Sequence, residues 1–203
     1  MAASDARVVK VLLLGDSGVG KSSIVDRYCR GKFIDHYTPT IGADFAVKEV
    51  MVGDQRVTMK IWDTAGQERY SSLGITYYRG TQCCVLVFDV TVPESFKALN
   101  KWKDEFVLHA NPTTPARHTC VVLGNKIDLE NREVTSDEAR RWCLANGDIP
   151  YFETSAIECT NVDQVFQFIA MNIVLHVTAE PDFLTTSVRL EEPKKRRKKS
   201  QCC

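Results

Sequence analysis

The stretch from Gly15 to Ser22 has the residue types and spacing of a loop that binds phosphate groups. It reads GDSGVGKS, follows an apolar run over residues 8–14, and fits the pattern G-x-x-x-x-G-K-[ST] between a strand and a helix. Glycines let backbone N–H groups converge on a polyphosphate without clashes of Cβ atoms. Lys21 can reach the terminal phosphates, and Ser22 can offer its hydroxyl to Mg²⁺. A glycine-rich turn with an exposed lysine is the alternative, which the flanking segments disfavour. The candidate binding residues of this stretch are Gly15, Asp16, Ser17, Gly18, Val19, Gly20, Lys21, Ser22 and Ser23.

Three further motifs stand where apolar segments end. They are Asp63-Thr64-Ala65-Gly66-Gln67, Asn125-Lys126-Ile127-Asp128 and Thr154-Ser155-Ala156. Ligands of open α/β sheets bind beyond the carboxyl ends of the strands. We therefore expect all four motifs to meet at one site.

The elements that must position these motifs are strands alternating with helices. Apolar runs and alternating patterns predict strands over residues 7–14, 44–52, 56–62, 83–88, 120–123 and from 151. Helices are expected over residues 22–29 and behind capping residues Thr91, Thr135 and Thr160, with Val107 on the apolar face of the second. Residues 32–42 and 63–80 are expected to form irregular loops. The alternation predicts a mainly parallel sheet, and the hairpin around Gly53 adds one antiparallel edge strand.

Composition limits the class of protein. The chain has 203 residues, of which 44% are hydrophobic and 26% charged, as expected for one globular domain with a tail. No apolar run approaches the roughly 18 residues of a transmembrane helix, so we expect a cytosolic chain. Six basic residues at 194–199 in a chain of zero net charge leave −6 on the remainder. The spacing of the cysteines favours small buried thiols over a disulfide framework or a zinc site at Cys29, Cys83, Cys84, Cys120, Cys143 and Cys159.

Together the four motifs resemble the signature boxes of the Ras-type small GTPases. The resemblance covers about residues 8–173. It implies an α/β fold: a three-layer P-loop NTPase G domain whose six-stranded, mostly parallel sheet carries five helices. It also implies a division into a GTP-binding domain over residues 1–177 and a disordered tail over residues 178–203, where periodicity stops.

The motif at residues 125–128 is then expected to bind the base. Guanine presents N1–H and N2–H donors side by side, and the carboxylate of Asp128 can accept both hydrogen bonds. Asn125 would tie this loop to the phosphate loop, and the stem of Lys126 would lie on the ring. Ser155 and Ala156 belong to the last box, in which the N–H of Ala156 would meet guanine O6. The family continues with lysine where this chain has Ile157, which puts nucleotide affinity in question rather than base choice.

By the same resemblance, Asp63 supports Mg²⁺ through water and Thr40 is a second hydroxyl ligand beside Ser22. The N–H of Gly66 would meet the γ-phosphate, and Gln67 would orient the attacking water. The resemblance adds two aromatic residues near the nucleotide, Phe33 and Tyr37.

Catalysis is expected to be slow without help. Phosphoryl transfer needs charge neutralisation, and neither Arg69 nor Arg79 is an obvious arginine finger. A partner that supplies the missing group would raise the rate by roughly 10³ to 10⁵. Contacts to the γ-phosphate would order residues 32–42 and 64–80, and hydrolysis would release them.

Further motifs resemble the Rab branch, and the segments KEVMV, CCVLVFDVT, GNKIDLENR and IPYFETSA, spread over residues 48–156, resemble its Rab-seven subgroup, which is associated with late endosomes, lysosomes and vacuoles. The Rab motifs are IGADF, IWDTAGQERY and YYRG, beginning at residues 41, 61 and 77. Phe45, Trp62 and Tyr77, with Ile41 beside them, match the aromatic triad through which Rab proteins meet effectors. Burial of these aromatic residues in the core is the alternative interpretation.

The last residues resemble the Rab ending that is prenylated on both cysteines, here Cys202 and Cys203. With the basic run at 194–199, the lipid chains would hold the protein on the cytosolic face of late endosomal, lysosomal or vacuolar membranes, from which it cycles to the cytosol. A nuclear-localisation or nucleic-acid patch is the rival interpretation of the basic run. The partners implied are an exchange factor, a GTPase-activating protein, escort and GDI-type proteins and effectors, with a monomeric chain and no nucleic acid.

Two other functions stay open at this point. An ATP-using P-loop enzyme would show a preference for ATP, against the expectation from Asp128. A nucleotide-bound scaffold without switching would bind its partners equally in both nucleotide states, against the expectation from Gln67 and Thr40.

Overall fold

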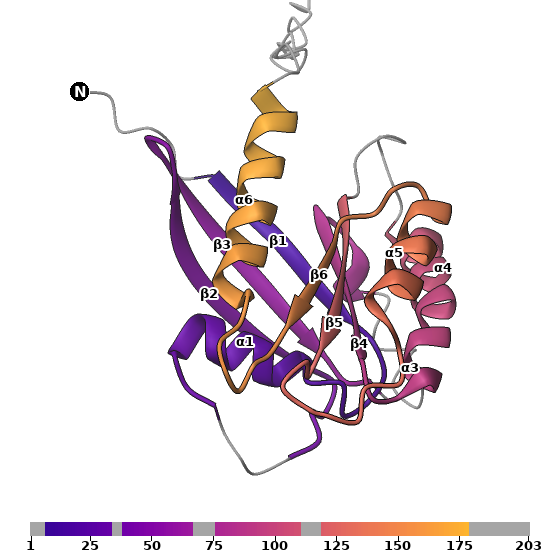
Figure 1. Cartoon of the computed structure of the whole chain (residues 1–203). Coiled ribbons are helices and arrows are strands. Elements are labelled where there is room, and N and C mark those ends of the chain that lie inside the picture. Colours follow the sequence, from indigo (N-terminus) through magenta and orange to yellow (C-terminus); the bar gives the residue numbers. More distant parts are fainter. Residues whose placement is uncertain (1–6, 34–37, 67–75, 111–118, 179–203) are drawn as a thin grey trace, which may run out of the picture.

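The computed structural model describes residues 7–33, 38–66, 76–110 and 119–178, which form one sheet with helices on both faces (Figure 1). The six strands lie in the order β2-β3-β1-β4-β5-β6. Neighbouring strands are parallel except for the antiparallel pair β2 and β3 at one edge. The predicted fold class is therefore confirmed. The strands are β1 Arg7–Leu14, β2 Ala43–Val52, β3 Gln55–Thr64, β4 Cys83–Asp89, β5 Thr119–Asn125 and β6 Tyr151–Thr154; the helices are α1 Lys21–Arg30, α3 Pro93–Lys97, α4 Leu99–His109, α5 Ser136–Ala145 and α6 Val162–Thr178.

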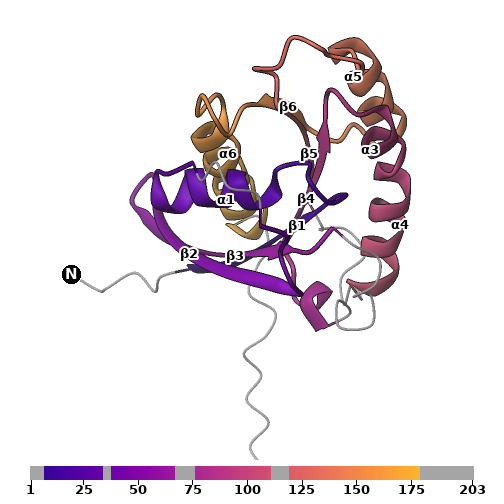
Figure 2. The same cartoon turned by 90° about the horizontal axis from the view of Figure 1, so that it is seen from below.

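The two faces of the sheet are covered by different helices. Helices α1 and α6 lie on one face, and α3, α4 and α5 lie on the other (Figure 2). The period of two along β1 explains this division, because Val11 and Leu13 pack toward α1 and α6 whereas Leu12 and Leu14 pack toward α4. Burial on both sides makes β4 apolar throughout until Asp89.

The position of β1 in the sheet determines where the phosphate loop lies. Strand β1 is central in the sheet and ends at Leu14, so residues 15–20 emerge at its carboxyl edge before α1 begins at Lys21. Gly20 occupies the N-cap position with φ of 96°, a backbone conformation that glycine adopts without strain. The packed sheet therefore fixes both ends of the loop.

Two of the predicted helix caps are wrong. Thr91 does not cap a helix, because its hydroxyl donates to Asp89 Oδ1 at 2.7 Å and the N-cap of α3 is Val92. The expected helix is also divided at Ala98 into α3 and α4, and Val107 is 60% exposed rather than on the apolar face.

Thr160 instead forms an isolated β-bridge with Ser155, so α6 begins later, at Val162. Thr135 is a true cap, since its hydroxyl accepts the backbone N–H of Glu138 at 3.2 Å. The apolar face of α6 is buried as predicted, from Val162 to Ile173.

The cysteines differ in burial. Cys83, Cys84 and Cys143 are buried, whereas Cys29 and Cys120 are half-buried. Cys159 is exposed, so its interpretation as a buried thiol is wrong. Within the described residues, no helix combines the length and the apolarity that crossing a membrane requires.

Candidate nucleotide site

A cavity of about 380 Å³ opens beyond the carboxyl ends of β1, β3 and β5. It joins the phosphate loop and the start of α1 to residues 38–40 and to the loops after β5 and β6. Its wall is formed by Ser17, Gly18, Gly20, Lys21, Ser22, Ser23, Asp26, Phe33, Thr38, Pro39, Thr40, Thr64, Gly66, Asn125, Lys126, Asp128, Ala156 and Ile157. The four motifs predicted to meet are therefore represented in one wall.

The side chain of Lys21 lies inside the phosphate loop. Its Nζ donates to the carbonyl oxygens of Gly15 at 2.7 Å and Asp16 at 2.8 Å, and the residue is only 5% exposed. Burial lowers the pKa of Lys21 to about 8, although the nearby carboxylates of Asp63 and Asp16 act to raise it. A buried cation in a loop at a helix N-terminus makes this end of the cavity suited to an anion.

Three hard oxygen donors converge beside that lysine. Ser22 Oγ donates to Asp63 Oδ2 at 2.5 Å and lies 2.8 Å from Thr40 Oγ1. Thr40 Oγ1 is also 3.4 Å from Asp63 Oδ2. Burial raises the pKa of Asp63, against the hydrogen bond from Ser22 and the charge of Lys21.

This cluster fits Mg²⁺. Within the described residues, Asp63 Oδ1 is buried without a hydrogen-bond partner, and hydroxyl and carboxylate oxygens are the donors that Mg²⁺ prefers. Ser22, Thr40 and Asp63 are the three residues for which the sequence predicted metal contacts.

Gly66 lies against the phosphate loop. A Cβ atom at this residue would lie 2.2 Å from the backbone nitrogen of Ser17, so any larger residue would push the loop away. The segment after β3 is therefore in backbone contact with the phosphate loop, as a switch that reads phosphate would require.

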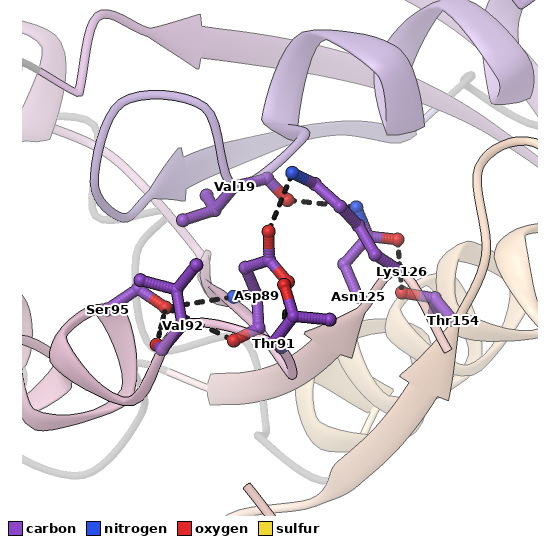
Figure 3. A network of polar contacts seen from close by, with 8 residues as sticks. All are labelled: Val19, Asp89, Thr91, Val92, Ser95, Asn125, Lys126 and Thr154. Atoms are coloured by element: carbon purple, nitrogen blue, oxygen red, sulfur yellow. Dashed lines mark hydrogen bonds and ion pairs between the residues drawn. The ribbon is translucent and has the colours of Figure 1, made fainter. Parts of the chain in front are cut away.

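The base end of the cavity is fixed by a polar network around the end of β5 (Figure 3). Asn125 Nδ2 donates to the carbonyl oxygen of Val19 at 2.9 Å, which is the expected link between the two loops. Thr154 Oγ1 donates to Asn125 Oδ1 at 3.2 Å and so orients the amide. Lys126 Nζ lies 2.6 Å from Asp89 Oδ2, and Asp89 in turn binds the N–H and hydroxyl of Thr91.

The guanine candidate Asp128 is oriented by the last motif. Ser155 Oγ donates to Asp128 Oδ1 at 2.6 Å, and Ser155 itself is fully buried. Ala156 and Ile157 line the cavity, with Ile157 51% exposed. Arg27 from α1 holds this loop, donating from Nε to Ala156 O at 2.7 Å and from Nη2 to Ile157 O at 2.8 Å.

The sequence did not predict four residues of the wall, Asp26, Thr38, Pro39 and Thr64, or three residues that support the loops around it, Arg27, Asp89 and Trp102. Trp102 Nε1, on α4, donates to Asp16 Oδ1 at 2.8 Å and supports the phosphate loop from the side. Asp89 follows an apolar strand, so the rule that ligand loops follow strand ends could have found it. A buried indole N–H needs an acceptor, which was the signal at Trp102, whereas nothing local marked Arg27.

Not every candidate lies in the wall of the cavity. Val19 and Ser155 are buried behind it and contribute backbone and orientation, and Gly15 and Asp16 bind Lys21 and Trp102. Other predicted site residues lie outside the described residues: Tyr37, Gln67, Arg69, Cys202 and Cys203.

The aromatic triad forms one cluster beside the site. The ring centroids of Phe45 and Trp62 lie 4.9 Å apart, and those of Trp62 and Tyr77 lie 5.2 Å apart. Phe45 is 42% exposed and Ile41 82% exposed, so part of the cluster faces solvent. This combination suits recognition better than full burial in the core.

Comparison with known proteins assigns the chain. The model of the Ras family matches residues 10–175. The chain belongs to the Ras family. It is 54% identical to Ras-related protein Rab7 of Drosophila melanogaster over 87% of this chain and 85% of that protein. It is 50% identical to Ras-related protein Rab-7a of Dictyostelium discoideum and 48% identical to GTP-binding protein yptV5 of Volvox carteri, in each case over the full length of both chains.

This Ras-family chain is a small GTPase, which converts GTP and water to GDP and phosphate. The family assignment agrees with the cavity, because its members bind GTP and GDP. The resemblance to Rab proteins of the Rab7 type is likewise confirmed.

Proposed function

We propose that the cavity binds GTP and GDP with Mg²⁺ and that each residue of the four motifs acts there as the sequence predicts. The observation that carries this proposal is the composition of one wall, with Lys21 and Ser22 at one end and Asn125 and Asp128 at the other. The first pair suits a polyphosphate and the second suits guanine. Because the motifs are far apart in the sequence, their meeting at one cavity is a strong argument for a nucleotide site.

The phosphate end would work mainly by charge neutralisation. Lys21 and the backbone N–H groups of residues 15–20 would bind the β- and γ-phosphates. Ser22 and Thr40 would hold Mg²⁺ directly, and Asp63 would act through water. The ion, when bound, supplies positive charge to the phosphate oxygens.

Hydrolysis would depend on Gln67 and on a partner. Gln67 would orient the attacking water, a role proposed from the sequence because this residue lies outside the described residues. No arginine belongs to the part of the cavity wall that the described residues form. Slow turnover by the chain alone would therefore be raised by a GTPase-activating protein.

The first experiment is to measure the nucleotide that the protein carries. Gently purified protein is denatured, and the released nucleotide is identified by chromatography. Exchange against GTP, GDP and ATP is then followed during Mg²⁺ chelation. Near-equimolar guanine nucleotide and no ATP exchange are expected, whereas an ATP-loaded protein would contradict the assignment of Asp128 to the base.

In the cell, we propose that this switch acts in vesicle traffic at late endosomes, lysosomes or the vacuole. The support is the identity to Rab7 of Drosophila melanogaster and to Rab-7a of Dictyostelium discoideum. The partners would be an exchange factor, a GTPase-activating protein, escort and GDI-type proteins, and effectors that contact Ile41, Phe45, Trp62 and Tyr77.

This cellular role is tested with a fluorescently labelled full-length chain carrying Trp62→Ala on β3 or, as a control, Trp142→Ala on α5, which packs near the other edge of the sheet. The label must stand at the N-terminus, so that Cys203 stays free. Colocalisation with an acidic-organelle dye is expected for the parent chain. Loss of effector binding is expected only for Trp62→Ala, because Trp142 packs against α3 away from the triad.

A further inference from the structure

Cys84 and Cys120 face each other across two neighbouring strands, far from any role in nucleotide binding. They are register partners on the parallel strands β4 and β5. Both side chains belong to the sheet face covered by α4, where Cys120 packs against the cluster that contains Cys84. Neighbouring strands lie about 4.8 Å apart, within the roughly 4.4–6.8 Å that separates Cα atoms in disulfides.

The two thiols have different environments. Cys84 is fully buried, whereas Cys120 is half-buried and so accessible to a small reagent. Burial raises the pKa of the Cys84 thiol. A hydrogen bond from Cys84, together with the charge of Lys103 on α4, lowers the pKa of Cys120.

Of these two thiols, Cys120 is therefore the one that loses its proton first. A thiolate near a lysine, partly exposed and beside a second thiol, has the features of an oxidation-sensitive cysteine. The remaining thiols lack this arrangement among the described residues: Cys83 points to the other face of the sheet, and its register partner is Thr119.

We propose that Cys84 and Cys120 form an oxidisable dithiol that peroxide closes to a disulfide between β4 and β5. The Cys120 thiolate attacks one oxygen of hydrogen peroxide, the O–O bond breaks, and hydroxide leaves to become water. Cys120 is then a sulfenic acid. The Cys84 sulfur attacks the Cys120 sulfur, the S–O bond breaks, and the Cys84 proton leaves with the oxygen as a second water. Two thiols are oxidised, and one peroxide is reduced to two waters.

The nucleotide site should survive this reaction. Asp89 and Asn125, which hold the base loops, stand at the carboxyl ends of the same two strands. The dithiol stands five positions before them on each strand. Oxidation should therefore leave the bound nucleotide in place.

The test uses the full-length, nucleotide-loaded chain with Cys202→Ser and Cys203→Ser, which remove two adjacent thiols. The protein is treated with hydrogen peroxide, remaining thiols are alkylated, and peptides are mapped without reduction. The expected product is the tryptic peptide of Cys120 joined to the peptide that holds both Cys83 and Cys84, reversible by dithiothreitol. Absence of this linkage, or Cys120 joined to another peptide, would overturn the proposal.

Matched variants distinguish the two vicinal cysteines. Cys83→Ala removes an equally buried thiol from the opposite face and should keep the linkage, whereas Cys84→Ala and Cys120→Ala should abolish it. Retained nucleotide shows that each variant is folded. Since Cys83→Ala leaves Cys84 as the only thiol of its peptide, linkage in that variant decides the assignment even where Cys84→Ala fails to fold. Linkage that persists in Cys84→Ala or vanishes in folded Cys83→Ala contradicts the proposal.

Discussion

Base selection depends on how a single carboxylate is held. Asp128 accepts a hydrogen bond from the buried hydroxyl of Ser155, and Ser155 is fixed in turn by its bridge to Thr160. The carboxylate therefore needs little reordering when it meets a base. Such preorganisation adds to affinity because less conformational entropy is lost on binding.

Asp128→Asn should weaken binding of GTP and GDP by roughly 10- to 10²-fold. An amide keeps one acceptor oxygen but turns an N–H donor toward the donors of guanine, so at least one charge-assisted hydrogen bond of about 1.5–3 kcal/mol is lost. Displacement of a fluorescent GDP analogue measures the change. Asp137→Asn, an exposed carboxylate on α5, is the control and should leave affinity unchanged. Equal affinities of the two variants would exclude a contact between Asp128 and guanine.

Gln67→Leu should slow hydrolysis and spare nucleotide binding. Leucine has no group that can orient water, whereas the phosphate contacts proposed for Lys21 and Ser22 do not involve this side chain. Single-turnover conversion of bound GTP measures the rate, with Gln164→Leu on the exposed surface of α6 as control. An unchanged rate would remove Gln67 from the mechanism.

At the scale of elements, helices outside the cavity determine the geometry of its loops. Helix α4 holds the phosphate loop through Trp102 and Asp16, and α1 holds the last motif through Arg27. Strand β4 holds Lys126 through Asp89. A change in the packing of α4 should therefore alter the phosphate loop, and through it the binding of the phosphates, although α4 does not contact the nucleotide directly.

Trp102→Phe should accelerate release of GDP by roughly tenfold. The phenyl ring keeps most of the apolar packing of the indole, but the carboxylate of Asp16 no longer accepts the hydrogen bond from Trp102 Nε1. A hydrogen bond to a charged group contributes about 1.5–3 kcal/mol at most. Release of a fluorescent GDP analogue into excess GTP measures the effect. Trp142→Phe is the matched control, because its indole N–H donates to Asn100 at the surface, 3.2 Å away. Similar acceleration in both variants would mean that loss of packing, rather than support of the loop, controls release.

The sequence predicted the strands and the nucleotide motifs because those signals are local. A run such as residues 83–88 is apolar throughout, and the phosphate loop is one continuous segment. Contacts between distant segments were predicted only where the family motifs imply them, as for Asn125 and the phosphate loop. Trp102 and Asp16 are 86 positions apart, and Arg27 and Ala156 are 129 apart. The predicted caps at Thr91 and Thr160 were wrong for another reason, since local partners took their polar groups: the hydroxyl of Thr91 donates to Asp89, and the backbone of Thr160 pairs with Ser155.

At the scale of the whole molecule, the nucleotide site and the last turn of α6 lie at opposite ends of the strands. Figure 1 shows the last turn of α6 at one end of the molecule and the start of α1, which borders the phosphate loop, at the other. An anchor beyond residue 178 would therefore be joined to the described domain at the end that lies away from the cavity. This arrangement favours a division of labour in which the G domain binds nucleotide and partners and the tail binds the bilayer.

A chain truncated after residue 178 should keep its bound nucleotide and should no longer associate with membranes. All described residues of the cavity precede that position, and the buried core residues described on α6 extend to Val174. Nucleotide content of the purified protein, and sedimentation of cell membranes with the labelled protein, measure the two properties. Loss of nucleotide on truncation would contradict the division into domain and tail.

Two full-length variants separate the contributions of lipid and charge. Cys202→Ser with Cys203→Ser should move the protein to the cytosolic fraction, because stable anchoring needs two lipid chains or one chain with a basic patch. Replacement of all six basic residues at 194–199 by glutamine removes an attraction of about 1 kcal/mol per charge near an anionic surface. That variant should stay on membranes but be less sensitive to salt than the parent chain. If the cysteine variant still sedimented with membranes and the glutamine variant did not, charge rather than prenylation would be the anchor.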